Sequence, residues 1–130
     1  YSQSKLANVL FTYELARRLE GTGATATVLH PGVVRTAFGR EDAGRFMRLM
    51  FPLVTPFMKS PEQGAATSIY LASSPEIAGV TGVYFADRRA KQSSKSSYDL
   101  DLARRLWEVS ADLVGVEPDR NRPETTKEQA

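Results

Sequence analysis

Cysteine is absent from the 130-residue sequence, which excludes disulfide cross-links and thiolate metal sites within it. Its absence does not identify a cellular compartment. Long apolar runs are missing too, so that no stretch could span a bilayer and none resembles a signal peptide. We therefore expect a cytoplasmic location, while membrane association of a longer parent protein stays open.

A strong excess of one charge is also lacking. The formal net charge is +2, and acidic and basic residues are interspersed. This balance gives no support to nucleic-acid binding. The hydrophobic fraction of 42% and the charged fraction of 25% are ordinary for a globular chain of one-domain length. No metal-binding residues are predicted.

The first half of the sequence predicts one long helix and one strand. Residues 2–20 are strong helix formers followed by glycines, and their apolar residues cover two faces, so we expect a helix buried on two sides. The sequence ATATVLH predicts a strand at 25–30, and Pro31-Gly32 predicts a tight turn after it. His30, at the end of this strand, is expected to be a packed structural residue rather than a catalytic one.

The rest of the sequence predicts three more helices and a second strand. Ser60-Pro-Glu-Gln63 combines a capping box with proline at the first helical position, which is a strong helix start. The last helix is expected to pack through Leu102, Leu106, Val109 and Leu113, with Trp107 beside this face. In chain order, the predicted elements are a short helix at 42–50, a helix at 60–72, a strand at 81–86, a polar basic loop at 87–97 and a helix at 99–114.

The alternation of helices and strands indicates an α/β layer structure. Two strands cannot form a stable open sheet on their own, so we expect them to be one edge of a larger sheet whose other strands lie before Tyr1. Residues 1–116 would then be the C-terminal half of a domain. The polar, charged composition of residues 117–130 predicts a disordered tail.

Tyr1 and Lys5 stand four residues apart, so their side chains lie on one face of the first helix. A free tyrosine has a pKa of about 10, and ionising it at neutral pH costs roughly 4 kcal/mol. An ammonium about 4 to 5 Å away offsets roughly 3 to 4 kcal/mol of this cost at an effective dielectric constant near 20. The pair could thus serve proton transfer, although the same spacing is common in solvated helix pairs.

The motifs surrounding this pair point to a family. YSQSKLANVLFTYELARRL, followed after one strand by HPGVVRT, resembles the second half of a short-chain dehydrogenase/reductase. In that family Y-x-x-x-K opens the helix before the sixth strand, and P-G-x-V-x-T follows that strand. Together with SPEQGAATS, VYF and RLWEVSADLVG, these motifs look especially like the retinol dehydrogenase branch. The resemblance implies an α/β fold, specifically the C-terminal part of a Rossmann-like, doubly wound parallel sheet.

The resemblance also implies roles for single residues. Tyr1 would be the general acid/base that exchanges a proton with the substrate, and Lys5 would lower its pKa and hold the nicotinamide ribose hydroxyls. The implied cofactor-binding residues are Lys5, Pro31, Gly32, Val34 and Thr36. The cofactor would be NADP or NAD, with NADP slightly favoured because this branch often uses it. The glycine-rich turn that decides between them in the family has no counterpart here.

Residues 37–59 are rich in phenylalanine and methionine and correspond to the family's substrate-binding lid. They suit an apolar alcohol, aldehyde or ketone, such as a retinoid, a steroid or a long-chain aldehyde. Core packing and contact with a membrane surface are alternatives for this segment. The basic loop is expected to be solvated, with a phosphate or an anionic membrane as the alternative. The family's use of the first helix implies a homodimeric or tetrameric parent.

These features lead to the hypothesis of an NAD(P)-dependent oxidoreductase that interconverts an apolar alcohol and its aldehyde or ketone. The sequence would be a fragment that is inactive on its own, because the family's phosphate-binding turn, catalytic serine and relay asparagine have no counterpart in it. Three alternatives stay open. They are a reductase of a conjugated ring, as in protochlorophyllide reduction, a nucleotide-binding regulator without catalysis, and a truncated reading frame without function.

Overall fold

The computed structural model describes residues 2–34 and 58–117, which belong to two compact units. Each unit is described by itself below. Among the described residues, the first unit contains 2–28, 79–84 and 92–117, and the second contains 29–34, 58–78 and 85–91.

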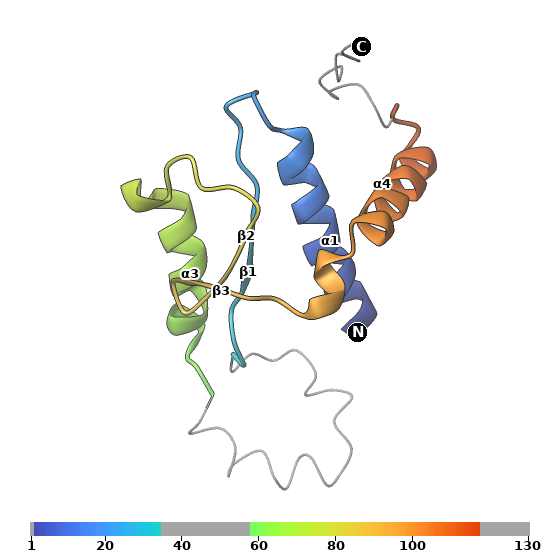
Figure 1. The fold of residues 1–130 in the computed structure, drawn as a ribbon. Coiled ribbons are helices and arrows are strands. Elements are labelled where there is room, and N and C mark those ends of the chain that lie inside the picture. Colours follow the sequence, from blue (N-terminus) through green and yellow to red (C-terminus); the bar gives the residue numbers. More distant parts are fainter. Residues whose placement is uncertain (1, 35–57, 118–130) are drawn as a thin grey trace, which may run out of the picture. The chain divides into compact units, whose positions relative to one another are not determined.

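Helices and strands alternate along most of the described chain (Figure 1). The α-helices are α1 (Ser2–Arg18), α3 (Pro61–Ser73) and α4 (Leu100–Val114). The strands are β1 (Thr27–His30), β2 (Val83–Ala86) and β3 (Arg89–Lys91), and two short 3-10 helices, η2 (Pro75–Ile77) and η3 (Lys95–Tyr98), connect the larger elements. This order confirms the predicted α/β class.

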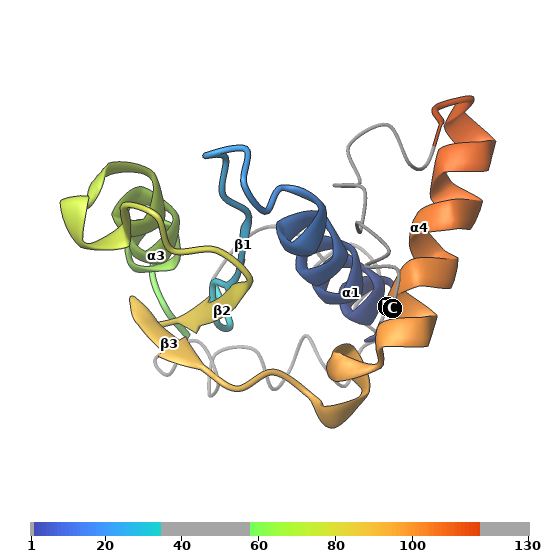
Figure 2. The ribbon, with the colours of Figure 1, turned by 45° about the horizontal axis from the view of Figure 1, so that its top comes forward.

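In the first unit, α1 lies beside α4, as both views of the ribbon show (Figures 1 and 2). The ring of Phe11 stacks on that of Trp107 with 5.0 Å between the centroids, and the Arg18 guanidinium lies 4.6 Å from the centre of the Trp107 ring. Stacked rings and cation–π contacts of this kind add to the stability that area burial supplies. The buried apolar residues of this unit are Leu10, Tyr13, Ala16, Ala103 and Ala111.

The packed face of α4 differs from the predicted one. Leu102, Val109 and Leu113 are exposed by 42%, 52% and 82%. The side of the helix that carries Ala103, Trp107 and Ala111, spaced four residues apart, is the one that packs. Small alanines allow α1 to approach closely while Trp107 meets Phe11, and this outweighs the stripe of larger aliphatic residues.

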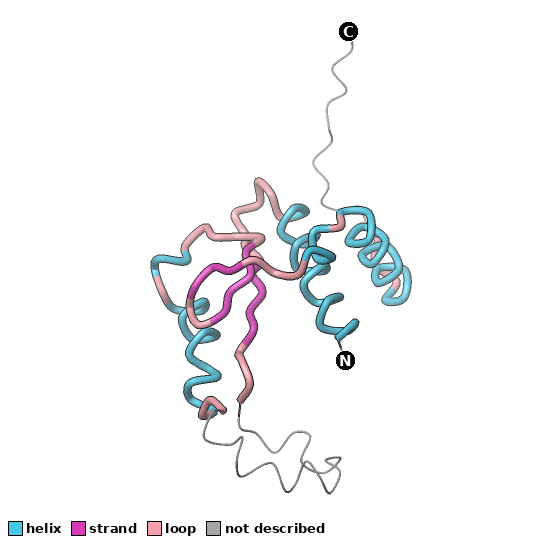
Figure 3. The backbone as a smooth tube through the Cα atoms, turned by 60° about the horizontal axis from the view of Figure 1, so that its bottom comes forward, coloured by secondary structure: helices cyan, strands magenta, loops and turns pink. Residues whose placement is uncertain are grey.

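The three strands form one sheet in the order β1-β2-β3 (Figure 3). The amide of Gly82 donates to the carbonyl of Ala26 over 2.8 Å, which joins the residues just before β1 and β2, so these two strands run in the same direction. β2 and β3 are joined by Asp87 and Arg88, which have φ angles of 55° and 59°. Two such residues make a type I′ turn, whose twist suits an antiparallel hairpin.

This hairpin corrects the prediction for residues 87–97. The segment was expected to be a loop, but it contains β3 and then η3. The usual signal for a two-residue hairpin is glycine or asparagine at the positions of positive φ. Here those positions hold Asp87 and Arg88, so the turn could not be recognised from its residues alone.

The start of α3 agrees closely with the prediction. The Gln63 amide donates to the Ser60 hydroxyl over 3.2 Å, and the Ser60 amide donates to the Gln63 side-chain oxygen over 2.9 Å. This reciprocal pair is the capping box read from SPEQ, with Pro61 at the first helical position. α4 begins similarly at Asp99, whose carboxylate accepts from the Leu102 amide over 3.0 Å.

Three predicted segments fall wholly or mostly outside the described residues. They are the short helix at 42–50, most of the lid at 37–59 and most of the tail at 117–130. Within residues 2–34 and 58–117, no helix combines the length and the apolar character needed to cross a bilayer.

Candidate functional site

The predicted site residues are distributed over both units. Tyr1 and Thr36 lie outside the described residues. Lys5 lies on α1 in the first unit with an exposed side chain. Pro31, Gly32 and Val34 lie together in the second unit, on the segment that directly follows β1. The structure therefore brings three of the predicted cofactor-binding residues together on one segment.

The segment after β1 turns sharply at Gly32, which has a φ angle of 84°. This left-handed conformation favours glycine, because a Cβ would be strained there. Val33, directly after it, is 66% exposed. The predicted tight turn at Pro31-Gly32 is thus present, and the residue that follows it is exposed to solvent.

Lys59 holds this turn from a position 28 residues further along the chain. Its amide donates to the Val33 carbonyl over 2.9 Å, and its ammonium donates to the Pro31 carbonyl over 3.4 Å. Val34 and Lys59 also form a parallel β-bridge. Sequence reasoning missed Lys59, and the only signal available was that it stands immediately before the capping box.

The first turn of α3 packs tightly against the same segment. A Cβ added to Gly64 would lie 2.5 Å from Cγ2 of Val34, well inside van der Waals contact. Gly64 is buried and has no positive φ angle, so the close approach of Val34, rather than backbone conformation, explains the glycine. The side chain of Val34 is thereby confined against α3.

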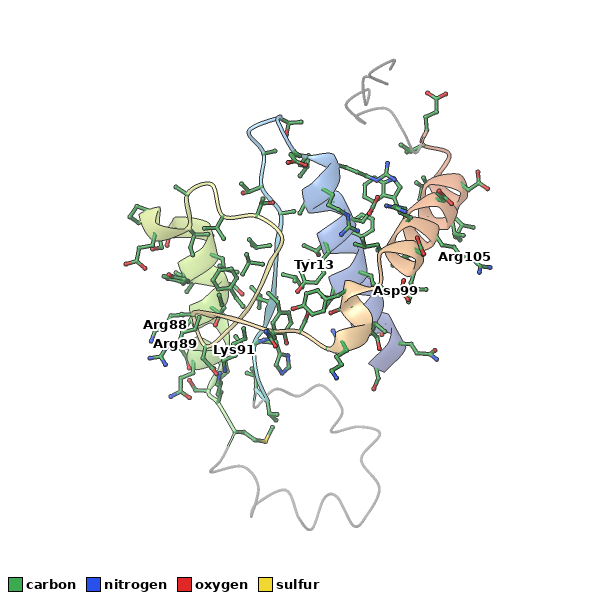
Figure 4. All side chains as sticks on the ribbon, in the orientation of Figure 1. Tyr13, Arg88, Arg89, Lys91, Asp99 and Arg105 are labelled. Atoms are coloured by element: carbon green, nitrogen blue, oxygen red, sulfur yellow. The ribbon has the colours of Figure 1, made fainter. Side chains whose placement is uncertain are left out.

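The β2–β3 turn carries a cluster of charges, and Figure 4 shows Arg88, Arg89 and Lys91 near it. Asp87 forms ion pairs with the ammonium groups of Lys59 and Lys91, the latter over 3.1 Å. Hydrogen bonds from Lys59 and then Lys91 lower the pKa of Asp87 from 3.8 to about 2. A surface hollow of about 470 Å³ is lined by Tyr70, Glu76, Asp87, Arg88, Arg89 and Lys91.

The helix that carries Lys5 is anchored by a partly buried hydroxyl network in the first unit. The Tyr13 hydroxyl is hydrogen-bonded to that of Ser93 over 2.7 Å, and Ser93 is hydrogen-bonded to Ser97 over 2.6 Å. Tyr13 also stacks on Tyr98 with 5.5 Å between the ring centroids. Burial raises the pKa of Tyr13, so this phenol is neutral and acts as a structural contact.

A buried carboxylate, Glu14, stabilises the end of the same helix. Burial alone would raise its pKa, but hydrogen bonds and charge from Arg17 and Arg18 lower it below the ordinary value. The arginines approach it to 2.6 Å and 2.8 Å. Glu14 is therefore ionised and fully paired, and it belongs to the packing of α1 rather than to catalysis.

The prediction that His30 is packed is wrong, because its side chain is exposed at the end of β1. Among the described residues, no group of three or more histidine, cysteine, aspartate or glutamate side chains could hold a metal ion.

Comparison with known proteins gives a consistent set of relatives. The chain is 52% identical over 118 residues to retinol dehydrogenase 14 of Homo sapiens, a match that covers 89% of this chain and 35% of the relative. It is 47% identical over 121 residues to retinol dehydrogenase 13 and 44% identical over 116 residues to retinol dehydrogenase 11, both of Homo sapiens. These matches cover 90% and 89% of this chain, and 37% and 36% of the relatives. No protein-family model matches the chain.

The resemblance to the retinol dehydrogenase branch of the short-chain dehydrogenases/reductases is therefore confirmed. The chain spans only about a third of the length of the curated relatives that it matches.

Proposed function

We propose that this chain, as a homologue of the retinol dehydrogenases, is part of an NAD(P)-dependent oxidoreductase that interconverts an apolar alcohol and its aldehyde or ketone. The observation that carries the proposal is the 52% identity to retinol dehydrogenase 14 over 89% of this chain. The sequence of this chain also contains both site motifs, YSQSK at its start and HPGVVRT after the first strand. Because the match covers 35% of that relative, the phosphate-binding elements of the dinucleotide site would be supplied by residues outside these 130.

In this proposal Tyr1 exchanges a proton with the substrate oxygen, and Lys5 favours the ionised phenol from the next turn of α1. Lys5 has the chemistry needed to hold ribose hydroxyls, since its ammonium carries three rotatable donors and its side chain is exposed. The bound dinucleotide would supply the hydride chemistry.

The segment after β1 fits the nicotinamide end of a dinucleotide. Its turn at Gly32 is tight, Val33 is exposed, and Val34 is confined against Gly64. Pro31 and Gly32 would turn the chain beneath the nicotinamide, and the Val34 backbone and the Thr36 hydroxyl would hold the carboxamide. Fixing the carboxamide fixes the ring face that meets the substrate, and such orientation accelerates transfer.

Finer features of the proposal concern the substrate, the cofactor and the assembly. Residues 37–59 would cover a long apolar substrate such as a retinoid. NADP is slightly favoured over NAD, and the complete protein would be a homodimer or tetramer. A preference for short polar sugars over long-chain aldehydes would contradict the lid assignment.

Substitution of the two motif residues tests the proposal. In the longest chain that the gene encodes, Tyr1→Phe should abolish nearly all turnover and leave dinucleotide binding intact, because only the proton donor is lost. Lys5→Ala should weaken both turnover and binding, since this residue serves the phenol and the ribose together. Tyr70→Phe and Lys95→Ala are matched controls outside the proposed site. Substantial turnover by the Tyr1→Phe protein would overturn the assignment.

The 130 residues on their own offer a second test. Without a phosphate-binding turn, the dinucleotide affinity should be millimolar or weaker, which corresponds to about 4 kcal/mol or less of binding free energy. Calorimetric titration of residues 1–130 with NAD(H) and NADP(H), with thermal unfolding in parallel, measures this. Micromolar binding together with a cooperative transition would contradict the view that essential parts of the site lie elsewhere.

A further inference from the structure

Two segments that are distant in sequence from Lys59 contact it in the second unit. Its backbone pairs with the segment at 31–34, its side chain reaches the Pro31 carbonyl, and its ammonium pairs with Asp87 in the β2–β3 turn. Residues 31, 59 and 87 are separated by 28 positions each. Lys59 therefore joins its own segment to the segment at 31–34 and to the β2–β3 turn, and its contacts fix how these three segments are arranged.

We propose that Lys59, held by Asp87, is a positioning residue that shapes the segment at 31–34 for the nicotinamide end of the dinucleotide. This inference rests on the proposed function and deepens it. It assigns Lys59 no contact with the substrate or with the reacting atoms.

Lys59 contacts two carbonyl groups of the segment, one through its backbone and one through its side chain. The Lys59 amide satisfies the Val33 carbonyl over 2.9 Å, and its ammonium approaches the Pro31 carbonyl to 3.4 Å. With both carbonyls engaged, the peptide groups that join Pro31 to Gly32 and Val33 to Val34 are held in one orientation. The groups of Val33 and Val34 that remain are then presented in a fixed direction.

The side chain of Lys59 also packs against Gly32. A Cβ at Gly32 would lie 2.9 Å from Nζ, 3.1 Å from Cε and 3.2 Å from Cδ of Lys59. The end of the lysine side chain therefore occupies the space where a Cβ of residue 32 would lie. A shorter or branched side chain at position 59 would leave this space open and the turn less restrained.

The Lys59 ammonium is paired with Asp87 and is therefore not available to bind an anion. This ion pair instead holds the ammonium beside the turn at 31–34. The Asp87 carboxylate is shared between Lys59 and Lys91, and the Lys59 ammonium is already engaged with the Pro31 carbonyl. The Lys59 side chain is 33% exposed, so its head is partly removed from solvent. An ammonium with two partners is oriented by them, and the orientation passes to the turn.

The experiment compares two ligands that share the adenosine end and differ in the nicotinamide. In the longest chain that the gene encodes, Lys59→Met should weaken NADP(H) and NAD(H) binding about tenfold, which is the effect of losing about 1.4 kcal/mol. Binding of adenosine diphosphate ribose and its 2′-phosphate should change less than about twofold, because these ligands lack the ring and the carboxamide. Lys59→Arg, which keeps a cation and a long stem, should restore most of the dinucleotide affinity. Lys95→Met is the matched control and should bind both ligands as the parent protein does.

Three outcomes would overturn the inference: equal losses for both ligands in Lys59→Met, no loss for either, or no rescue by arginine. Failure of the proposed function is recognised separately, because the unsubstituted protein would then bind neither ligand. In that case hydrogen exchange of the peptides covering 31–34 and 58–64 still tests whether Lys59 orders the turn at 31–34. Faster exchange in Lys59→Met but not in Lys95→Met would support ordering of the turn by Lys59, and unchanged exchange would overturn it.

Discussion

The contacts that hold α1 differ in kind from those that hold the segment at 31–34. In the first unit, Tyr13, Ser93 and Ser97 form a neutral network in which Ser97 is 2% and Tyr13 is 8% exposed. In the second unit, Lys59, Asp87 and Lys91 form a charged cluster whose side chains are 33% to 53% exposed. Each region carries residues of the proposed site, but the two respond to different physical conditions.

The two kinds of contact have different effects: the neutral network mainly contributes to stability, and the charged cluster mainly orients a turn. A buried neutral network is little affected by salt and contributes to stability because its groups would be left unsatisfied if one were removed. Exposed ion pairs contribute little stability and are screened by salt, but they can still orient a turn. We therefore expect changes near α1 to alter the free energy of unfolding, and changes at the charged cluster to alter ligand binding more than stability.

The largest effect is expected at the α1–α4 contact. Trp107→Ala removes the stack on Phe11 and the contact with Arg18, and should lower the free energy of unfolding of the longest chain by about 2 to 3 kcal/mol, less than for a fully buried tryptophan. Leu113→Ala, at a residue that is 82% exposed, is the control and should change it by less than about 0.5 kcal/mol. Urea unfolding measures both. A larger effect at Leu113 would mean that the outer stripe of α4 is covered in the complete protein.

A smaller loss is expected where α3 meets the segment at 31–34. Gly64→Ala places a methyl group against Val34 and should destabilise the protein by about 1 to 2 kcal/mol, even though alanine favours the helix. Val34→Ala in the same chain removes the obstructing methyl groups, so the double variant should be more stable than the sum of the two single changes predicts. Simple additivity in urea unfolding would show that the two residues do not meet.

Within the neutral network, Ser97→Ala should cost about 1 kcal/mol of unfolding free energy, because it removes a buried hydroxyl and leaves the half-buried Ser93 hydroxyl without one of its partners. The neighbouring Ser96 is exposed, and Ser96→Ala should leave the stability unchanged. The cost at Ser97 should be the same at low ionic strength and in about 1 M salt, where exposed ion pairs are screened. Strong salt dependence at Ser97 would remove the contrast between the two regions.

The smallest effect on stability is expected for Asp87→Asn. The pKa of Asp87 is lowered to about 2, so its carboxylate stabilises the folded protein above its ordinary pKa of 3.8 and loses this contribution as the pH falls toward 2. The difference in stability between the parent protein and Asp87→Asn should therefore be present at pH 5 and be largely lost at pH 2. It should also shrink with added salt. Urea unfolding at intervals across this pH range tests the sign, and a difference that grew toward acid would contradict it.

Local signals in the sequence were sufficient for several elements and for the family resemblance. The SPEQ motif predicted the start of α3 because a capping box involves only residues within one helical turn. The turn at Gly32 followed from the Pro-Gly pair, and the motifs around Tyr1, Lys5 and Pro31 pointed to the retinol dehydrogenase branch that the comparisons confirm. The roles of Tyr1, Lys5, Pro31, Gly32, Val34 and Thr36 stay predictions.

Only the tertiary structure decided how these local pieces meet. The α4 pattern predicted a packed face of Leu102, Leu106, Val109 and Leu113 with Trp107 beside it. The packed side is instead centred on Trp107 and the two alanines, because α1 presents Phe11 to it. Lys59 and Asp87 are 28 residues apart, and nothing near either residue in the sequence indicates the other. Hydrogen bonds within one turn involve residues that are neighbours along the chain, so the sequence predicts them. An ion pair between distant residues forms only where the fold of the whole chain brings the two residues together.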